Sequence, residues 1–122
     1  MSPTVGALLI PTLDNSHTRC VPRYPFIVDI ELIDMQSGIT IKARTKNLSL
    51  FGCGVDTLEA FPRATNVGIK LSHGDEYILA KARVVYSSKE LGMGVAFLGI
   101  EAEYERILDG WIVQLSTVNR AN

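Results

Sequence analysis

Residues 26–34 read FIVDIELID, and this stretch sets the fold class of the chain. Its apolar side chains recur at every second position, so Phe26, Val28, Ile30 and Leu32 fall on one face of an extended backbone. A period of two is the pattern of a β-strand with one buried face. The stretch is therefore predicted to be the first strand of a sheet.

Five further segments show the signature of short strands, and Gly, Pro, Asn and Asp residues separate them. In the longest of these segments, Ile78, Ala80, Ala82, Val84 and Tyr86 are expected to share the inward face. The five segments are residues 39–46, 53–57, 67–72, 77–88 and 91–100.

The period changes after residue 100. In residues 101–118 the apolar positions follow the i, i+3, i+4, i+7 pattern of an amphipathic helix that packs one stripe on a core. Gly110 lies within this helix, where glycine costs about 1 kcal/mol relative to alanine, so it is expected to mark a close contact. The stripe consists of Tyr104, Ile107, Leu108, Trp111, Ile112 and Leu115.

Six strands followed by one helix predict an all-β fold with a C-terminal helix, namely a six-stranded antiparallel β-barrel that the helix caps. Residues 1–17 show no sustained period and are expected to form a flexible N-terminal arm. The barrel domain with its helix is expected to span residues 18–117. Residues 118–122 are expected to be a frayed C-terminus.

The bulk composition excludes several function classes. The chain has 122 residues, which is one domain, and a net charge of −1 from 12 basic and 13 acidic residues. A partner that is a nucleic acid polymer is not expected, because such binding needs a basic surface. No apolar run reaches the roughly 18–20 residues of a membrane span, and no signal peptide is evident, so a cytoplasmic protein without membrane insertion is expected.

The reactive residue types form no catalytic or metal-binding pattern. Cys20 and Cys53 are not a C-x-x-C pair and have no histidine at metal spacing, so no metal site is expected. Two reduced thiols are the simpler interpretation, and an approach of the two cysteines in the fold stays open. No nucleophile has a base beside it, and no carboxylate pair is spaced for acid–base chemistry. The chain is therefore not expected to be an enzyme or to need a cofactor.

Two segments break the strand pattern, TRCVPRYPF at 18–26 and NLSLFGCG at 47–54. The first holds two arginines four positions apart, and the second holds Asn and Gly where strands normally avoid them. The 24 positions from Arg23 to Asn47 allow one hairpin to bring both segments to the same edge of the barrel. The candidate site residues are Arg19, Arg23, Asn47, Ser49 and Gly52.

These residue types suit a ligand that contains guanine rings and phosphates. The planar fork of arginine fits phosphate oxygens and also the O6 and N7 edge of guanine. Asparagine can donate to and accept from a base edge, serine adds a hydroxyl, and glycine leaves space for close approach.

The two segments resemble the signature of the PilZ domain family, bacterial receptors for the second messenger cyclic di-GMP. The signature is present as Arg19-x-x-x-Arg23 followed by Asn47-x-Ser49-x-x-Gly52. The stretch GMGVAF is similar to the last strand of the family, and a six-stranded barrel with a C-terminal helix is the family architecture. The resemblance covers residues 18–116.

The resemblance implies a receptor or adaptor domain that binds cyclic di-GMP. Arg19 and Arg23 would grip phosphates and guanine edges, and Asn47 would bond a guanine edge. Ser49 would contact a phosphate, and Gly52 would give the base room.

Ligand binding is also expected to fold the arginine-bearing arm over the barrel face and to present a new surface to an unidentified effector protein. In the family, the residue before the first arginine varies, and it influences whether one ligand or a stacked pair binds. Here that residue is Thr18, so the number of ligand copies stays open. The oligomeric state is also open. The alternatives are a PilZ-like interaction module that binds no nucleotide and a barrel for single-stranded nucleic acid, which would need more exposed aromatics than Tyr24 and Phe51.

Overall fold

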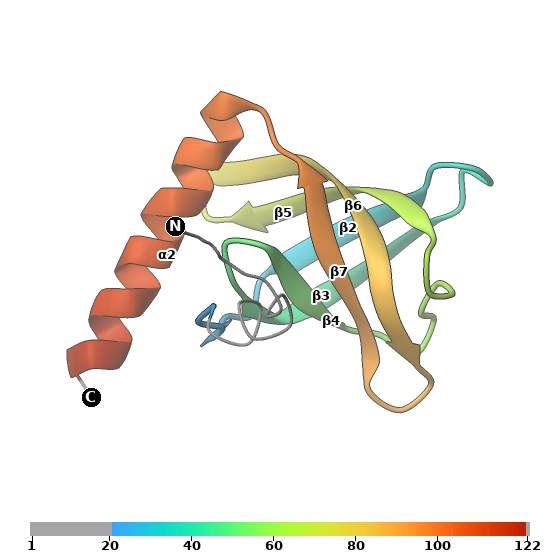
Figure 1. Cartoon of the computed structure of the whole chain (residues 1–122), viewed down its shortest axis with the longest axis horizontal. Coiled ribbons are helices and arrows are strands. Elements are labelled where there is room, and N and C mark those ends of the chain that lie inside the picture. The colour runs from blue at the N-terminus through green and yellow to red at the C-terminus, as the bar shows by residue number, and fades with distance from the viewer. Residues whose placement is uncertain (1–20, 122) are drawn as a thin grey trace, which may run out of the picture.

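The structure is a computed structural model that describes residues 21–121, with side chains up to residue 118. The expectations for residues 1–17 and for Thr18, Arg19 and Cys20 lie outside the described residues. Figure 1 shows a small barrel with one helix beside it. Its elements are β1 (Tyr24–Pro25), β2 (Asp29–Asp34), β3 (Thr40–Leu48), β4 (Gly52–Asp56), β5 (Asn66–His73), β6 (Glu76–Ser88), β7 (Gly92–Gly99) and α2 (Ala102–Ala121).

Six strands close on themselves in the order β3-β2-β5-β6-β7-β4, because β4 pairs back onto β3. All of the pairings are antiparallel. Closure leaves no free sheet edge in the ring. The predicted six-stranded antiparallel barrel with a C-terminal helix is confirmed, and the short β1 is an addition that pairs with the end of β3.

The predicted first strand, residues 26–34, begins only at Asp29, and Thr45 of β3 is the reason. This side chain is only 2% exposed. Its hydroxyl donates to the carbonyl oxygen of Phe26 at 2.6 Å and accepts from the amide of Val28 at 3.0 Å. The backbone at residues 26–28 is thus satisfied partly by a side chain, and regular pairing of β2 begins at Asp29.

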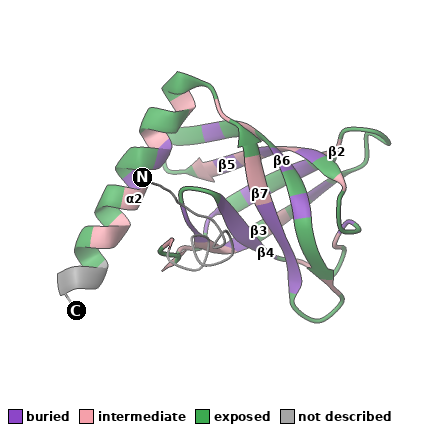
Figure 2. Cartoon of the chain, in the orientation of Figure 1, coloured by how far each residue is buried: buried purple, intermediate pink, exposed green. Residues whose placement is uncertain are grey.

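The inward face of the barrel carries the hydrophobic core (Figure 2). The alternation predicted from the sequence is confirmed for β2, where Ile30 and Leu32 are buried, and for most of β6. The largest fully buried side chains are Ile30, Leu32, Leu48, Leu71, Ile78, Met93, Leu108, Val55, Val67, Val84 and Thr45.

The helix α2 packs its predicted apolar stripe against this core, and Leu108 and Trp111 are buried. The indole N–H of Trp111 donates to a carboxylate oxygen of Glu76 at 2.8 Å, which fixes the helix to the start of β6. Nearer the start of the helix, Tyr104 packs on Tyr77 of β6 with ring centroids 5.8 Å apart. The helix continues four residues beyond the expected domain end at residue 117.

Gly110 does not mark a close contact, so that expectation is wrong. A Cβ added at Gly110 would have no neighbour within 4 Å, and the residue is exposed. We therefore expect Gly110→Ala to raise the free energy of unfolding by about 1 kcal/mol, the difference in helix propensity between the two residues. Urea unfolding followed by circular dichroism would measure the change.

Gly74→Ala is the matched control for this substitution. A Cβ at Gly74 also meets nothing within 4 Å, but its φ of +62° is left-handed. Alanine there should lower the free energy of unfolding by about 1 kcal/mol or more. A loss of stability in the Gly110 variant would contradict the propensity argument.

Candidate functional site

One row of four residues crosses the outer face of the barrel in register. Asn47 of β3 pairs with Gly54 of β4, Gly54 with Gly94 of β7, and Gly94 with Tyr86 of β6. The two central residues have no side chain, so the middle of the row is a flat floor of backbone. The side chains of Asn47 and Tyr86 lie over this floor from its two sides.

The contacts of the two outer residues depend on the glycines. The side-chain oxygen of Asn47 accepts the amide of Gly54 at 2.9 Å, and a Cβ at Gly54 would come within 3.0 Å of the Asn47 amide nitrogen. The ring of Tyr86 lies across Gly94, where a Cβ would come within 2.1 Å of the ring. Gly54 and Gly94 therefore allow these side chains to lie flat on the barrel.

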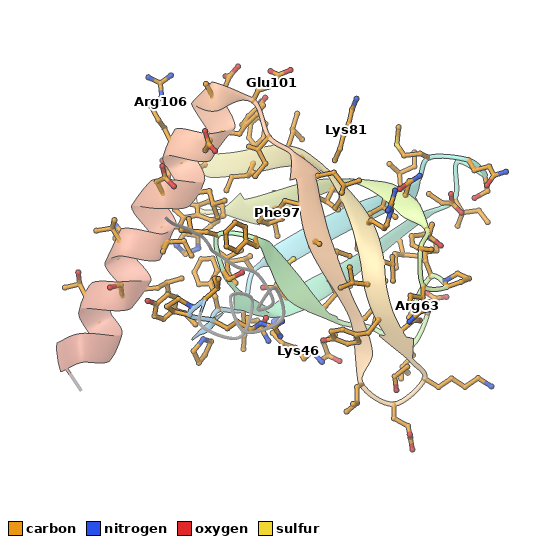
Figure 3. The ribbon with its side chains drawn as sticks, viewed as in Figure 1. Lys46, Arg63, Lys81, Phe97, Glu101 and Arg106 are labelled. Carbon is orange, nitrogen blue, oxygen red and sulfur yellow. The ribbon has the colours of Figure 1, made fainter. Side chains whose placement is uncertain are left out.

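Two irregularities in strand pairing produce this arrangement. The register shifts on β3 between Thr45 and Asn47 and on β6 between Val84 and Tyr86. Such β-bulges redirect side chains and are common beside functional sites. The extra residue on β3 is Lys46 (Figure 3). Its ammonium group donates to the carbonyl oxygen of Leu91 in the β6–β7 hairpin.

Tyr86 is a site residue that the sequence pattern missed. Strict alternation places it on the inward face with Val84, and this expectation is wrong because the bulge turns it outward. Its side chain is 36% exposed and lines the candidate pocket. Gly94, opposite it in GMGVAF, is the signal that could have indicated an aromatic ring lying across the strand.

The turn between β3 and β4 uses the hydroxyl of Ser49 internally. This oxygen accepts the amide of Phe51 at 3.1 Å and donates to the carbonyl oxygen of Gly52 at 3.3 Å, and the residue is 6% exposed. The amide of Ser49 also donates to the Gly52 carbonyl at 2.9 Å. Ser49 lines the pocket, yet its hydroxyl is already engaged in the turn.

Removal of this hydroxyl should destabilise the protein even without a ligand. We expect Ser49→Ala to lower the free energy of unfolding by about 1 kcal/mol, because the amide of Phe51 loses its acceptor. Ser87→Ala, at an exposed strand position, is the control and should change stability by less than about 0.5 kcal/mol. Equal stabilities of the two variants in urea unfolding would show that the turn does not depend on the hydroxyl.

Gly52 has a structural role that differs from the expected one. A Cβ at this position would come within 2.1 Å of the carbonyl oxygen of Val95 on β7 and within 3.1 Å of the Cα of Ala96. The space beside its Cα is therefore filled by the neighbouring strand. Glycine is required here for the pairing of β4 with β7, and the expectation that it leaves room for a base stays a prediction.

The candidate residues meet at one pocket of about 250 Å³. Arg23 reaches it from the segment before β1 and is the only charged residue among the described residues that line it. Four of the five predicted site residues are thus brought together, and Arg19 lies outside the described residues. The described lining consists of Val21, Arg23, Asn47, Ser49, Phe51, Gly52, Cys53, Val85, Tyr86, Gly94, Val95 and Ala96.

The pocket holds groups suited to binding, and its two potential nucleophiles are poorly placed for chemistry. Burial raises the pKa of the Cys53 thiol to about 12, so the thiol stays protonated and unreactive. The Ser49 hydroxyl contacts no basic side chain in the part of the chain described. Within residues 21–118, no group of three His, Cys, Asp or Glu residues could hold a metal ion. None of the described helices is long and apolar enough to span a membrane.

These features define a small closed barrel domain with a largely apolar pocket that one arginine enters, and with a helix at its C-terminus. The family model for the PilZ domain matches residues 17–114. The chain belongs to the PilZ domain family, as the two motifs indicated.

Several solved structures share this fold, among them the following three. The PilZ domain of YcgR from Escherichia coli, solved with c-di-GMP, is 18% identical with a TM-score of 0.66, over 84% of this chain and 95% of that chain. The PilZ domain of CeSA from a cellulose-synthesizing bacterium is 18% identical with a TM-score of 0.63, over 78% of this chain and 98% of that chain. The Bacillus subtilis inhibitor of motility MotI/DgrA is 16% identical with a TM-score of 0.67.

The match to MotI/DgrA covers 85% of this chain and 53% of that protein, so the chain spans about half of its length. A search of curated proteins finds no match. At these identities the structural similarity concerns the fold.

Proposed function

We propose that this PilZ domain is a receptor for cyclic di-GMP and that the pocket beside Arg23 is its binding site. One observation carries the proposal: the motif residues Arg23, Asn47, Ser49 and Gly52 line a single pocket next to a flat backbone floor. The PilZ domain of YcgR was solved with this ligand. A binding function, rather than catalysis, agrees with the chemistry of the lining.

The row of four residues supports the recognition of a planar guanine. The Asn47 oxygen is held by the amide of Gly54, so its amide nitrogen remains as the donor for a ligand. The guanine edge offers two acceptors, O6 and N7, to such a donor. The floor of Gly54 and Gly94 can take a flat ring, and the ring of Tyr86 gives it an aromatic edge to pack against.

The charge of the pocket supports a ligand with two phosphates. No carboxylate is among its described lining residues, so nothing there opposes an anion. The guanidinium of Arg23 is exposed and makes no ion pair with the rest of residues 21–118, which leaves its five donors available. In the proposal Arg19 supplies the second fork, and the arm that carries both arginines closes over the barrel face and forms a surface for an effector protein.

Calorimetric titration of the protein with cyclic di-GMP tests the proposal, with cyclic di-AMP as the matched ligand. Saturable binding of cyclic di-GMP is expected. Cyclic di-AMP should bind at least about fivefold more weakly, because adenine presents a donor where guanine presents O6. If neither nucleotide binds to protein that is folded by circular dichroism, the proposal is wrong. An interaction module that binds no nucleotide is then the better description.

A further inference from the structure

The segment that carries Arg23 also supports the helix α2. Its two-residue strand β1 pairs with β3 at the motif, Tyr24 opposite Leu48 and Pro25 opposite Asn47. On its other side β1 contacts α2, whose remaining main contacts are with β6. The pocket and the helix thus share one short stretch of backbone.

Three aromatic rings make the connection to the helix. Phe26 follows β1 directly, and its ring centroid lies 5.7 Å from the ring of Trp111 on α2 and 5.1 Å from that of His73 at the end of β5. The rings of His73 and Trp111 are 5.6 Å apart, so the three rings contact one another in pairs. Aromatic pairs at such distances attract one another beyond simple area burial. Trp111 lies outside the pocket lining.

β1 is the shortest strand among the described residues. Pro25 has no backbone N–H, so it donates no hydrogen bond to Asn47 across the pair. The amide of Phe26 donates to the carbonyl oxygen of Lys46 at 3.2 Å, and the carbonyl oxygen of Phe26 accepts from the Thr45 hydroxyl at 2.6 Å, so the chain is anchored to β3 just after β1. A ligand that touches both Arg23 and Asn47 would add a second anchor to β3 on the other side of β1.

We propose that α2 reports the occupancy of the pocket, through the contact of Phe26 with Trp111. The inference rests on the proposed function. Cyclic di-GMP that joins Arg23 to Asn47 holds β1 against β3. The ring of Phe26 is then held against Trp111, and α2 docks more tightly on the barrel. The helix is the element of this domain from which a partner protein reads the bound state.

By thermodynamic linkage, the coupling between the pocket and the helix contact acts in both directions. If the ligand stabilises the contact between Phe26 and Trp111, then a weaker contact must lower the affinity for the ligand by the same factor. We expect Phe26→Leu to weaken cyclic di-GMP binding by at least about fivefold, the lower end of typical couplings between sites. Phe26 does not line the pocket, so a direct contact with the ligand would not explain this loss.

Trp111 is the single tryptophan of the chain, so tryptophan fluorescence reports on the surroundings of this one side chain. Those surroundings include the rings of Phe26 and His73. The experiment titrates full-length protein with cyclic di-GMP and records calorimetry, tryptophan emission and amide hydrogen exchange of residues 104–116. Titration with GMP at matched absorbance corrects for light absorbed by the nucleotide. In the wild type we expect a saturable emission change and slower exchange around Leu108–Ile112, both with the midpoint found by calorimetry.

Two variants complete the test. Phe26→Leu should lose most of the helix response and bind more weakly. Phe61→Leu removes a ring from the same core, but this ring is on the loop between β4 and β5 and is not one of the three rings around Trp111, so this variant should keep both the response and the affinity. Binding by calorimetry without any change in emission or exchange would overturn the inference and leave the proposed function intact. An absence of binding would overturn both. A loss of the response in both variants alike would assign it to general stability and overturn the inference.

Discussion

Gly52→Ala should destabilise the barrel more than most other single substitutions in the strands, by about 3 kcal/mol or more. Its Cβ would come within 2.1 Å of the Val95 carbonyl oxygen, and this neighbour is backbone in a paired strand that has no flexible end to move away. Overpacking in a dense interior costs about 1–3 kcal/mol, and more where the backbone must shift. The shift would open the pairing of β4 with β7, one of the six pairings that close the ring. Urea unfolding followed by circular dichroism measures the loss.

Gly99→Ala is the matched control, since a Cβ there meets nothing within 4 Å. This variant should unfold within about 0.5 kcal/mol of the wild type. Equal stabilities of the two variants would show that β4 can move away from β7 at little cost, and the structural role assigned to Gly52 would be wrong. If the expected difference is found, a loss of ligand binding in any Gly52 variant reports on folding and cannot be used to map the site.

The residues of the motif Asn-x-Ser-x-x-Gly therefore also have structural roles, in addition to the binding roles that the resemblance implies. Asn47 holds the amide of Gly54, Ser49 holds the turn, and Gly52 allows two strands to approach. These three positions build the surface of the pocket before any ligand arrives. The groups left free for recognition are the Asn47 amide nitrogen, the Tyr86 ring and the guanidinium of Arg23.

The sequence was sufficient to predict the fold because the period of the apolar residues is a strong signal of secondary structure. Alternation in most of the six strand segments and a change to helical spacing after residue 100 predict the closed barrel and the buried stripe of α2. Two details were out of reach. The bulge that turns Tyr86 outward depends on pairing with a strand distant in sequence, and nothing in residues 77–88 alone announces it. The close approach at Gly52 likewise depends on β7. The motif spacing therefore indicates that glycine is needed at this position, but it does not show that the neighbouring strand is the reason.

The candidate site was predicted through chemistry and resemblance rather than through period. The spacing of the two motifs placed Arg23, Asn47, Ser49 and Gly52 at one edge, and the structure brings these four to one pocket. The part that Arg19 plays stays a prediction, because this residue lies outside the described residues. The motifs alone could not show which of these side chains build the pocket and which are left free for a ligand, because that distinction depends on their hydrogen-bond partners.

Arg23→Ala should have the largest effect on ligand binding among variants that leave the fold intact. We expect its affinity for cyclic di-GMP to fall by at least about 1.5 kcal/mol, roughly tenfold, because hydrogen bonds to charged groups contribute that much or more. Stability should change by less than about 0.5 kcal/mol, since the side chain is exposed and pairs with no carboxylate among the described residues. Calorimetry and urea unfolding on the same preparation give the two values.

Arg63→Ala separates a contact from a general charge effect. Arg63 lies on the loop between β4 and β5 (Figure 3). It lines a different hollow, with Asp34 and Asn66. The substitution Arg63→Ala removes the same charge from an exposed position, so the screened long-range attraction of the ligand changes comparably in both variants. Only the Arg63 variant keeps a complete pocket. A tenfold loss for Arg23→Ala with an unchanged affinity for Arg63→Ala places the ligand at the pocket. Equal losses would mean that net charge alone attracts the nucleotide, and unchanged affinity in both would mean that it binds elsewhere on the domain.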